Sequence, residues 1–157
     1  MTRYSSSAQD PTGADTGGTP VVPPYGAPLT LREATKIMVA AEAEATTNNW
    51  PVAIVIVDSC AVVVMIHKLD NTQHSSVDIA KGKALTAVNF RRPSKVFQDG
   101  IAKGGEGLRF LSLPGVTPLE GGLPIIVDGR LVGAIGVSGV LSTQDSQISA
   151  AGLKGLN

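Results

Sequence analysis

The chain has 157 residues, of which 43% are hydrophobic and 4% aromatic, so one domain with a core of Val, Ile, Leu and Ala is expected. Lys and Arg total 13, as do Asp and Glu, and this zero formal net charge argues against nucleic acid or an anionic membrane surface as a partner. The single cysteine, Cys60, excludes an internal disulfide, and no stretch reaches transmembrane length, so we expect a cytoplasmic protein without membrane association.

Residues 1–28 are rich in Ser, Thr, Gly and Pro and predict an N-terminal arm that is either flexible or extended across a neighbouring subunit. Residues 29–157 predict a single domain. Its first helix begins after Thr30, because Thr30 and Glu33 have the spacing of a capping box, and it ends at Asn48-Asn49.

The segments that follow predict two hairpins separated by helices. Residues 52–58 and 62–69 form an antiparallel pair of apolar strands, with both faces covered and a second chain as one candidate cover. Further expected elements are helices over 77–90 and 94–102, a short strand over 109–113, a hairpin over 123–139 that turns at Asp128-Gly129, and a helix from Ser142 with Asp145 in its capping box. This order predicts an α+β domain whose antiparallel sheet has about five strands with helices packed on it.

One face of the last strand carries small side chains. Its members are Val132, Ala134, Gly136 and Ser138. Two interpretations stay open: a helix packs closely against this face, or the face is the floor of a ligand pocket.

Few residues match a catalytic or metal-binding pattern. Ser138 in GVSGV resembles a nucleophile elbow, but His67 and His74 both precede it, which excludes a hydrolase of that type. Cys60, His67, Asp70 and His74 match no metal-site template, so no metal site is expected. Either histidine remains a candidate axial ligand for haem.

Basic residues concentrate between positions 81 and 103. They are Lys81, Lys83, Arg91, Arg92, Lys95 and Lys103. Such a patch suits a carboxylate or phosphate ligand, although a solvated face or a subunit contact would have the same composition. Lys83 lies within an apolar helical stripe, so it is either a desolvated base or Schiff-base nucleophile, or a side chain that extends to the surface.

Several segments resemble the haem-degrading-domain family, which includes HbpS- and GlcG-like proteins and the C-terminal domain of PduO. They are PVAIVIVD (51–58), HSSVDIAKGKALTAV (74–88), PGVTPLEGGLPIIVDGRLVGAIGVSG (114–139) and AAGL (150–153). The resemblance extends from Thr30 to Leu156. It implies profilin-like or PAS-like layering and assembly into homo-oligomers, commonly octamers. It also implies haem binding in one branch of the family and a place beside catabolic genes in others.

The resemblance also implies a set of pocket-lining positions. They are Asp58, Ser76, Lys83, Thr86, Gly121, Gly122, Gly136 and Ser138. The chain departs from the family pattern at Ser59-Cys60-Ala61, where glycine is common, and at Leu119-Glu120, where a carboxylate replaces small residues.

These observations leave the function open between classes. The first hypothesis is a homo-oligomeric protein that binds a planar anionic ligand, haem above all, with Lys83, Arg91 and Arg92 on the ligand's carboxylates, its ring on the Gly136 face, and His67 or His74 on the iron. The alternative is a cofactor-free catabolic enzyme of deaminase or isomerase type. It would act on a small unsaturated carboxylic acid, with Lys83 or Glu120 as acid/base. A third is a structural partner protein without chemistry.

Overall fold

The computed structural model describes residues 21–157, so the first 20 residues of the predicted arm lie outside the described part of the chain. The elements are α1 (Leu31–Thr47), β1 (Ala53–Asp58), β2 (Val63–Lys68), α2 (Ser76–Phe90), α3 (Lys95–Ala102), the 3-10 helix η1 (Gly105–Ser112), β3 (Gly122–Val127), β4 (Arg130–Ser138) and α4 (Ser142–Lys154). No helix in this part of the chain combines the length and the apolar character needed to cross a membrane.

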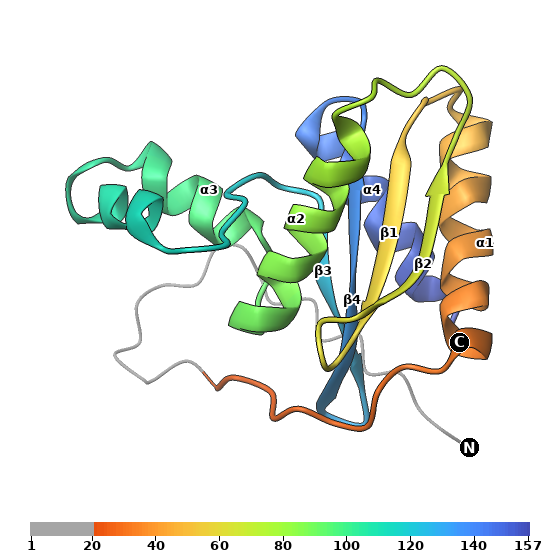
Figure 1. The fold of residues 1–157 in the computed structure, drawn as a ribbon, viewed down its shortest axis with the longest axis horizontal. Coiled ribbons are helices and arrows are strands. Elements are labelled where there is room, and N and C mark those ends of the chain that lie inside the picture. The colour runs from red at the N-terminus through yellow and green to blue at the C-terminus, as the bar shows by residue number, and fades with distance from the viewer. Residues whose placement is uncertain (1–20) are drawn as a thin grey trace.

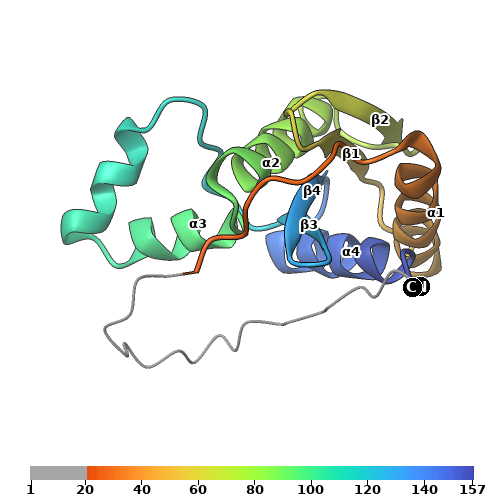
Figure 2. The same ribbon diagram turned by 90° about the horizontal axis from the view of Figure 1, so that it is seen from below.

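The four strands form one antiparallel sheet in the order β2-β1-β4-β3, with β1 and β4 at its centre (Figure 1). Alternate residues of β1 enter two separate cores. Ile54 and Ile56 face α1 and α4, whereas Val55 and Val57 face α2. The sheet therefore lies between α2 on one face and α1 with α4 on the other (Figure 2).

The predicted α+β class is confirmed, with one difference in the elements. The sheet has four strands rather than about five, because residues 109–113 fall mostly in η1 and pair with no strand of the sheet. The apolar character that suggested a strand serves packing instead: the Phe110 ring contacts Phe97 edge-on, with 5.2 Å between ring centroids. Together α3 and η1 project away from the layered body (Figure 1).

The second hairpin turns where the sequence predicts. Asp128 and Gly129 both have positive φ, 49° and 74°, as a type I′ turn requires. This turn sets β3 directly beside β4 in the register Gly122↔Gly136.

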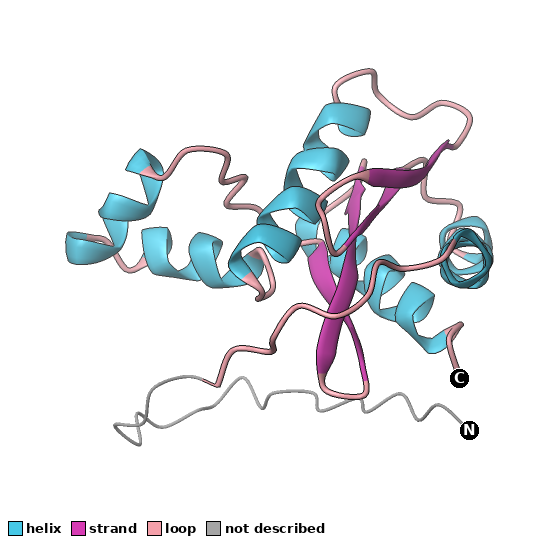
Figure 3. Ribbon diagram, turned by 60° about the horizontal axis from the view of Figure 1, so that its bottom comes forward, coloured by secondary structure: helices cyan, strands magenta, loops and turns pink. Residues whose placement is uncertain are grey.

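Residues 21–29, which begin with the last part of the predicted arm, run extended over the end of the chain's own sheet (Figure 3). We name this segment the strap. Tyr25 bridges Leu131 at the start of β4, and the Pro24 and Leu131 carbonyls accept hydrogen bonds from Leu131 and Gly26. The Tyr25 hydroxyl donates to the Val88 carbonyl at 3.0 Å, in the last turn of α2. The strap is thus tied to its own protomer.

The capping box of α1 forms as the sequence predicts and generates a pH-dependent prediction. The Thr30 amide donates to Glu33 Oε2 at 2.9 Å, and the Glu33 amide donates to Thr30 Oγ1 at 3.3 Å. The hydrogen bonds from Thr30 lower the pKa of Glu33 below its usual 4.5. This carboxylate therefore stabilises the fold above its unfolded-state pKa, and the contribution is lost as pH falls through the lower folded-state pKa.

We expect Thr30→Ala to lower the free energy of unfolding by about 1 kcal/mol at pH 7, as for other N-cap residues. Glu33→Gln should also destabilise at pH 7, and its difference from wild type should shrink at pH 3. Urea denaturation at both pH values measures this, with Glu106→Gln, an exposed glutamate, as the control. An equal effect of Glu33→Gln at pH 7 and pH 3 would contradict the assignment.

Candidate functional site

A buried ion pair crosses the molecule from one helical layer to the other. Lys83 on α2 donates from Nζ to Asp145 Oδ2 on α4 at 2.8 Å and to the Val137 carbonyl of β4 at 2.9 Å. The side chains of both charged residues are only 2% exposed. Lys83 neither extends to solvent nor faces an open site, so a substrate cannot contact its amine in this conformation.

Asp145 has a different role from the one that the sequence suggests. Leu141, not Ser142, precedes the first residue of α4, and its amide donates to Gln144 Oε1 at 3.1 Å. Asp145 Oδ1 accepts from the Val140 amide, while Oδ2 binds Lys83. Burial raises the pKa of Asp145, and the hydrogen bond and charge of Lys83 oppose that rise.

Glycines surround this pair because neighbouring backbone leaves no room for side chains. Gly121 has φ +125°, and a Cβ there would lie 3.0 Å from Lys83 Nζ. A Cβ on Gly122 would overlap the Lys83 carbonyl, and one on Gly136 would overlap the Ala80 carbonyl of α2. Ala134 and Gly136 are therefore covered by α2. Val132 does not share their face as predicted but packs on the core of α1 and α4, because the pairing of β3 with β4 shifts register beside it. Close helix packing is the correct interpretation, and the hypothesis that Gly136 admits a planar ring is wrong.

Other positions from the implied pocket set serve the fold in separate places. Asp58 Oδ1 accepts from the Cys60 and Val62 amides and shapes the β1–β2 turn. Thr86 Oγ1 donates to the Gly82 carbonyl and accepts from the Thr117 amide.

Two buried serines complete that set, and Glu120, the candidate acid/base, lies apart from Lys83. The Ser76 hydroxyl is fully buried and has no hydrogen-bond partner, and Ser138 is 4% exposed. Glu120 lies in a different ionic cluster from Lys83: its Oε2 is 3.5 Å from Lys95 Nζ, which also binds Asp99. The hydrogen bond that Lys95 donates to the Asp99 carboxylate raises the pKa of Lys95.

Arg91 and Arg92 follow the last residue of α2. Arg91 has φ 54°, and its guanidinium lies 5.3 Å from the centre of the Tyr25 ring. Arg92 Nε donates to the Phe90 carbonyl at 3.1 Å. Cations at a helix C-terminus complement the exposed carbonyls there, where an anionic ligand is disfavoured. His74 precedes the first residue of α2, whereas the two arginines follow its last residue. The 15 residues of α2 span about 22 Å, so the arginines and His74 do not converge within one protomer.

His67 is held by a partner that the sequence analysis missed. On β2, its Nδ1 lies 2.5 Å from Oε1 of Glu42 on α1. The side chains of His67 and Glu42 are 42% and 33% exposed. No local motif links the two residues, because they are 25 residues apart in the sequence. The one signal that points to Glu42 is its charge, which is half-buried on a helix that otherwise packs on the sheet. His74 lies exposed in the loop between β2 and α2.

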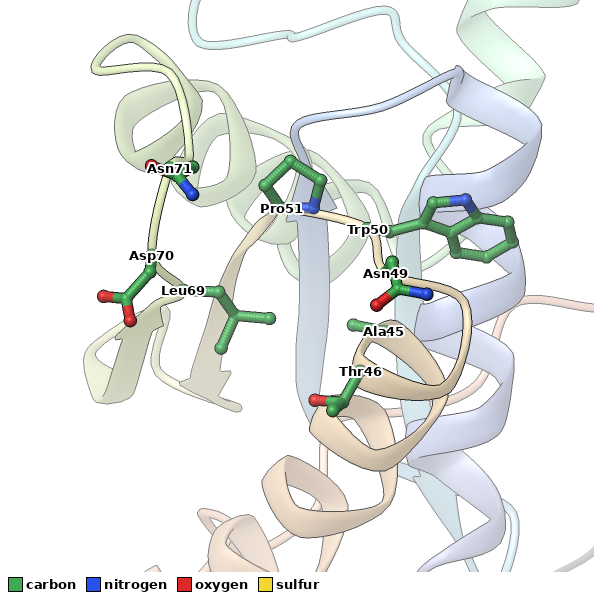
Figure 4. A pocket seen from close by; sticks show the side chains of 8 residues that line it. All are labelled: Ala45, Thr46, Asn49, Trp50, Pro51, Leu69, Asp70 and Asn71. Atoms are coloured by element: carbon green, nitrogen blue, oxygen red, sulfur yellow. The ribbon is translucent and has the colours of Figure 1, made fainter.

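An open hollow of about 410 Å³ lies where α1 ends and β2 leads into its following loop (Figure 4). It is lined by Ala45, Thr46, Asn49, Trp50, Pro51, Leu69, Asp70 and Asn71. The Trp50 ring and the Asp70 carboxylate point to opposite sides, so its polar groups do not converge on one ligand position (Figure 4). Within residues 21–157, no group of three or more His, Cys, Asp or Glu side chains is placed to hold a metal ion.

The buried ion pair yields a stability prediction. Lys83→Met and Asp145→Leu should each cost about 3–5 kcal/mol of unfolding free energy, because each leaves an uncompensated buried charge. The double variant should cost less than the sum, since it removes both charges. Urea denaturation measures all three. Lys95→Met is the control, because its Asp99 pair is about half exposed and should contribute under about 1 kcal/mol. A Lys83→Met effect as small as that of the control would refute the role of the pair.

The fold matches solved structures along nearly the whole described chain. A double mutant of HbpS from Streptomyces reticuli superposes with a TM-score of 0.77 at 29% identity, covering 96% of this chain and 99% of that one. The crystal structure titled PduOC:Heme Complex superposes with a TM-score of 0.75 at 25% identity, covering 83% of this chain and 96% of that one.

The sequence comparisons agree. Protein GlcG of Escherichia coli K12 is 35% identical over 110 residues, which is 70% of this chain and 81% of GlcG. Residues 29–154 match the family described as "Haem degrading protein HbpS-like". The predicted resemblance is therefore confirmed, and this chain belongs to the HbpS-like family.

Proposed function

We propose that this protein is a cytoplasmic, homo-oligomeric protein that binds a planar anionic ligand, with haem as the leading candidate, and that His67 supplies the iron ligand. The observation that carries the proposal is the His67–Glu42 pair. Metal-ligating histidines commonly bind a carboxylate through the ring nitrogen that does not face the metal. Here Nδ1 faces Glu42, and the ring is 42% exposed.

The surroundings of His67 suit a flat, largely apolar ligand at the surface. Met65, two residues earlier on β2, shares a strand face with His67 and packs half-buried on the core. Val39, one turn before Glu42 on α1, is 61% exposed. The superposable PduOC:Heme complex and the HbpS-like family membership support haem as the ligand class.

Catalysis at Lys83 or Glu120 has less support. The Lys83 amine is enclosed by Asp145 and the Val137 carbonyl. Glu120 is 9% exposed and lies beside Lys95 rather than beside a second acid/base group.

A haemin titration followed by visible absorbance tests the ligand. Wild type should show a sharp, saturable Soret band. His67→Ala should lose it, because the iron ligand is gone, and His74→Ala should keep it. A weak, broad band unchanged by His67→Ala would overturn the proposal and favour a structural partner protein without chemistry.

Self-association is supported by the projecting excursion formed by α3 and η1. The Phe97 ring packs edge-on against Phe90 and Phe110 with centroid distances of 5.0 and 5.2 Å, so the excursion has its own small core. It exposes three large apolar side chains. They are Val96, Leu108 and Leu111, with exposed fractions of 41%, 49% and 66%. We propose a second copy as the occupant, because an isologous contact would bury η1 of both protomers and the zero net charge gives little repulsion between copies.

Light scattering coupled to size exclusion tests the oligomer. Wild type should elute as a multiple of the chain mass, and Leu108→Ser/Leu111→Ser should reduce that mass. Leu141→Ser, at a 68% exposed leucine outside the excursion, is the control and should leave it unchanged. A monomeric wild type, or a double variant with unchanged mass, would overturn this part of the proposal.

A further inference from the structure

The geometry of Glu42 indicates a specific task for this carboxylate. Among the described residues its only hydrogen-bond and ion-pair partner is His67, at 2.5 Å. Glu44, two residues later on the same helix, instead binds Asn48 and Gln147. Glu42 is thus directed at one atom, Nδ1 of an imidazole, while Nε2 of that ring makes no hydrogen bond within the described chain.

This contact determines which ring nitrogen carries the proton. A carboxylate accepts hydrogen bonds and cannot donate one when ionised, so the neutral imidazole beside it holds its proton on Nδ1. Nε2 is then left with a free lone pair. The carboxylate also increases the electron density of the ring and therefore its strength as a donor.

We infer that Glu42 is a positioning residue: it fixes the His67 tautomer and ring orientation so that Nε2 is presented to an incoming iron centre. The inference rests on the proposed function for its link to haem, but the tautomer itself is a property of the ligand-free protein. As a surface ion pair alone, the contact would add little stability and would leave ligand affinity unchanged.

Ring-nitrogen NMR of the ligand-free protein gives the first test. The chain has two histidines, so a His74→Ala background leaves His67 as the only imidazole signal. At a pH where the ring is neutral, the background protein should show the Nδ1–H tautomer. Adding Glu42→Ala should shift it toward the Nε2–H tautomer that a histidine side chain without a partner prefers. Glu42→Gln keeps an accepting oxygen and should retain Nδ1–H. Identical tautomers in the background and the Glu42→Ala variant would overturn the inference.

Haemin affinity gives the second test. Glu42→Ala should weaken binding about 10–100-fold, the usual effect of removing a carboxylate that orients a metal-binding histidine. Glu42→Gln should have an intermediate effect, because it retains the tautomer but loses the charge. Glu44→Gln is the matched control and should bind as wild type does. Equal affinities for wild type and Glu42→Ala would overturn the positioning role.

The outcomes separate this inference from the proposed function. If haemin does not bind wild type, or binds His67→Ala equally well, the proposed function fails while the NMR result still decides whether Glu42 sets the tautomer. If haemin binding requires His67 but is unchanged in Glu42→Ala, the proposed function stands and the positioning role fails. Resonance Raman of the ferrous complex adds a readout of donor strength: the iron–histidine stretch should be higher in wild type than in Glu42→Gln.

Discussion

The close approach of α2 to β4 at Gly136 is the constraint on which much of the structure depends. The missing side chain allows the Ala80 carbonyl and the Ala84 amide to lie directly against the strand. A Cβ at this position would push the helix outward and separate the alanines of α2 from the valines of β1. Gly122 on β3 likewise has no side chain, which leaves room for the Lys83 carbonyl of α2.

The short distance between α2 and β4 allows an ion pair to join the helices on the two faces of the sheet. Lys83 begins on α2 and reaches past the sheet to Asp145 on α4, with the Val137 carbonyl as an intermediate partner. Buried ion pairs are costly to desolvate, so this pair specifies the position of the two helices more than it adds to net stability. The interior charge is thereby committed to the fold. In the proposed function the ligand binds instead at the surface, at His67 on β2, whose ring contacts Glu42 on α1.

Local patterns in the sequence predict the elements well, because their signals lie within a few residues. The capping box of α1, the Asp128-Gly129 turn and the helix after the second hairpin all depend on short-range contacts. The strand expected over 109–113 is absent, because periodicity alone cannot distinguish a strand from a segment whose aromatic side chain packs on Phe97.

The long-range partners could not be predicted from the sequence in the same way. Lys83 is recognisable as a charge within an apolar stripe, but Asp145 is 62 residues away and has a local explanation as a capping residue. Glu42 is one of several glutamates on α1, and only the fold places it opposite His67. Proximity in the sequence groups the two arginines with Lys83, whereas α2 separates them in space: Lys83 faces β4, and Arg91 and Arg92 follow the last turn of the helix.

The strap bears on where the folded unit begins. The family match starts at residue 29, yet the Tyr25 hydroxyl binds the Val88 and Asn89 carbonyls and the Pro24 carbonyl accepts from Leu131. A domain boundary placed at the start of the family match would therefore remove a C-terminal cap of α2 and a backbone partner of β4. The structural domain extends several residues further toward the N-terminus than the family match does, and an expressed fragment should include Pro23 to remain whole.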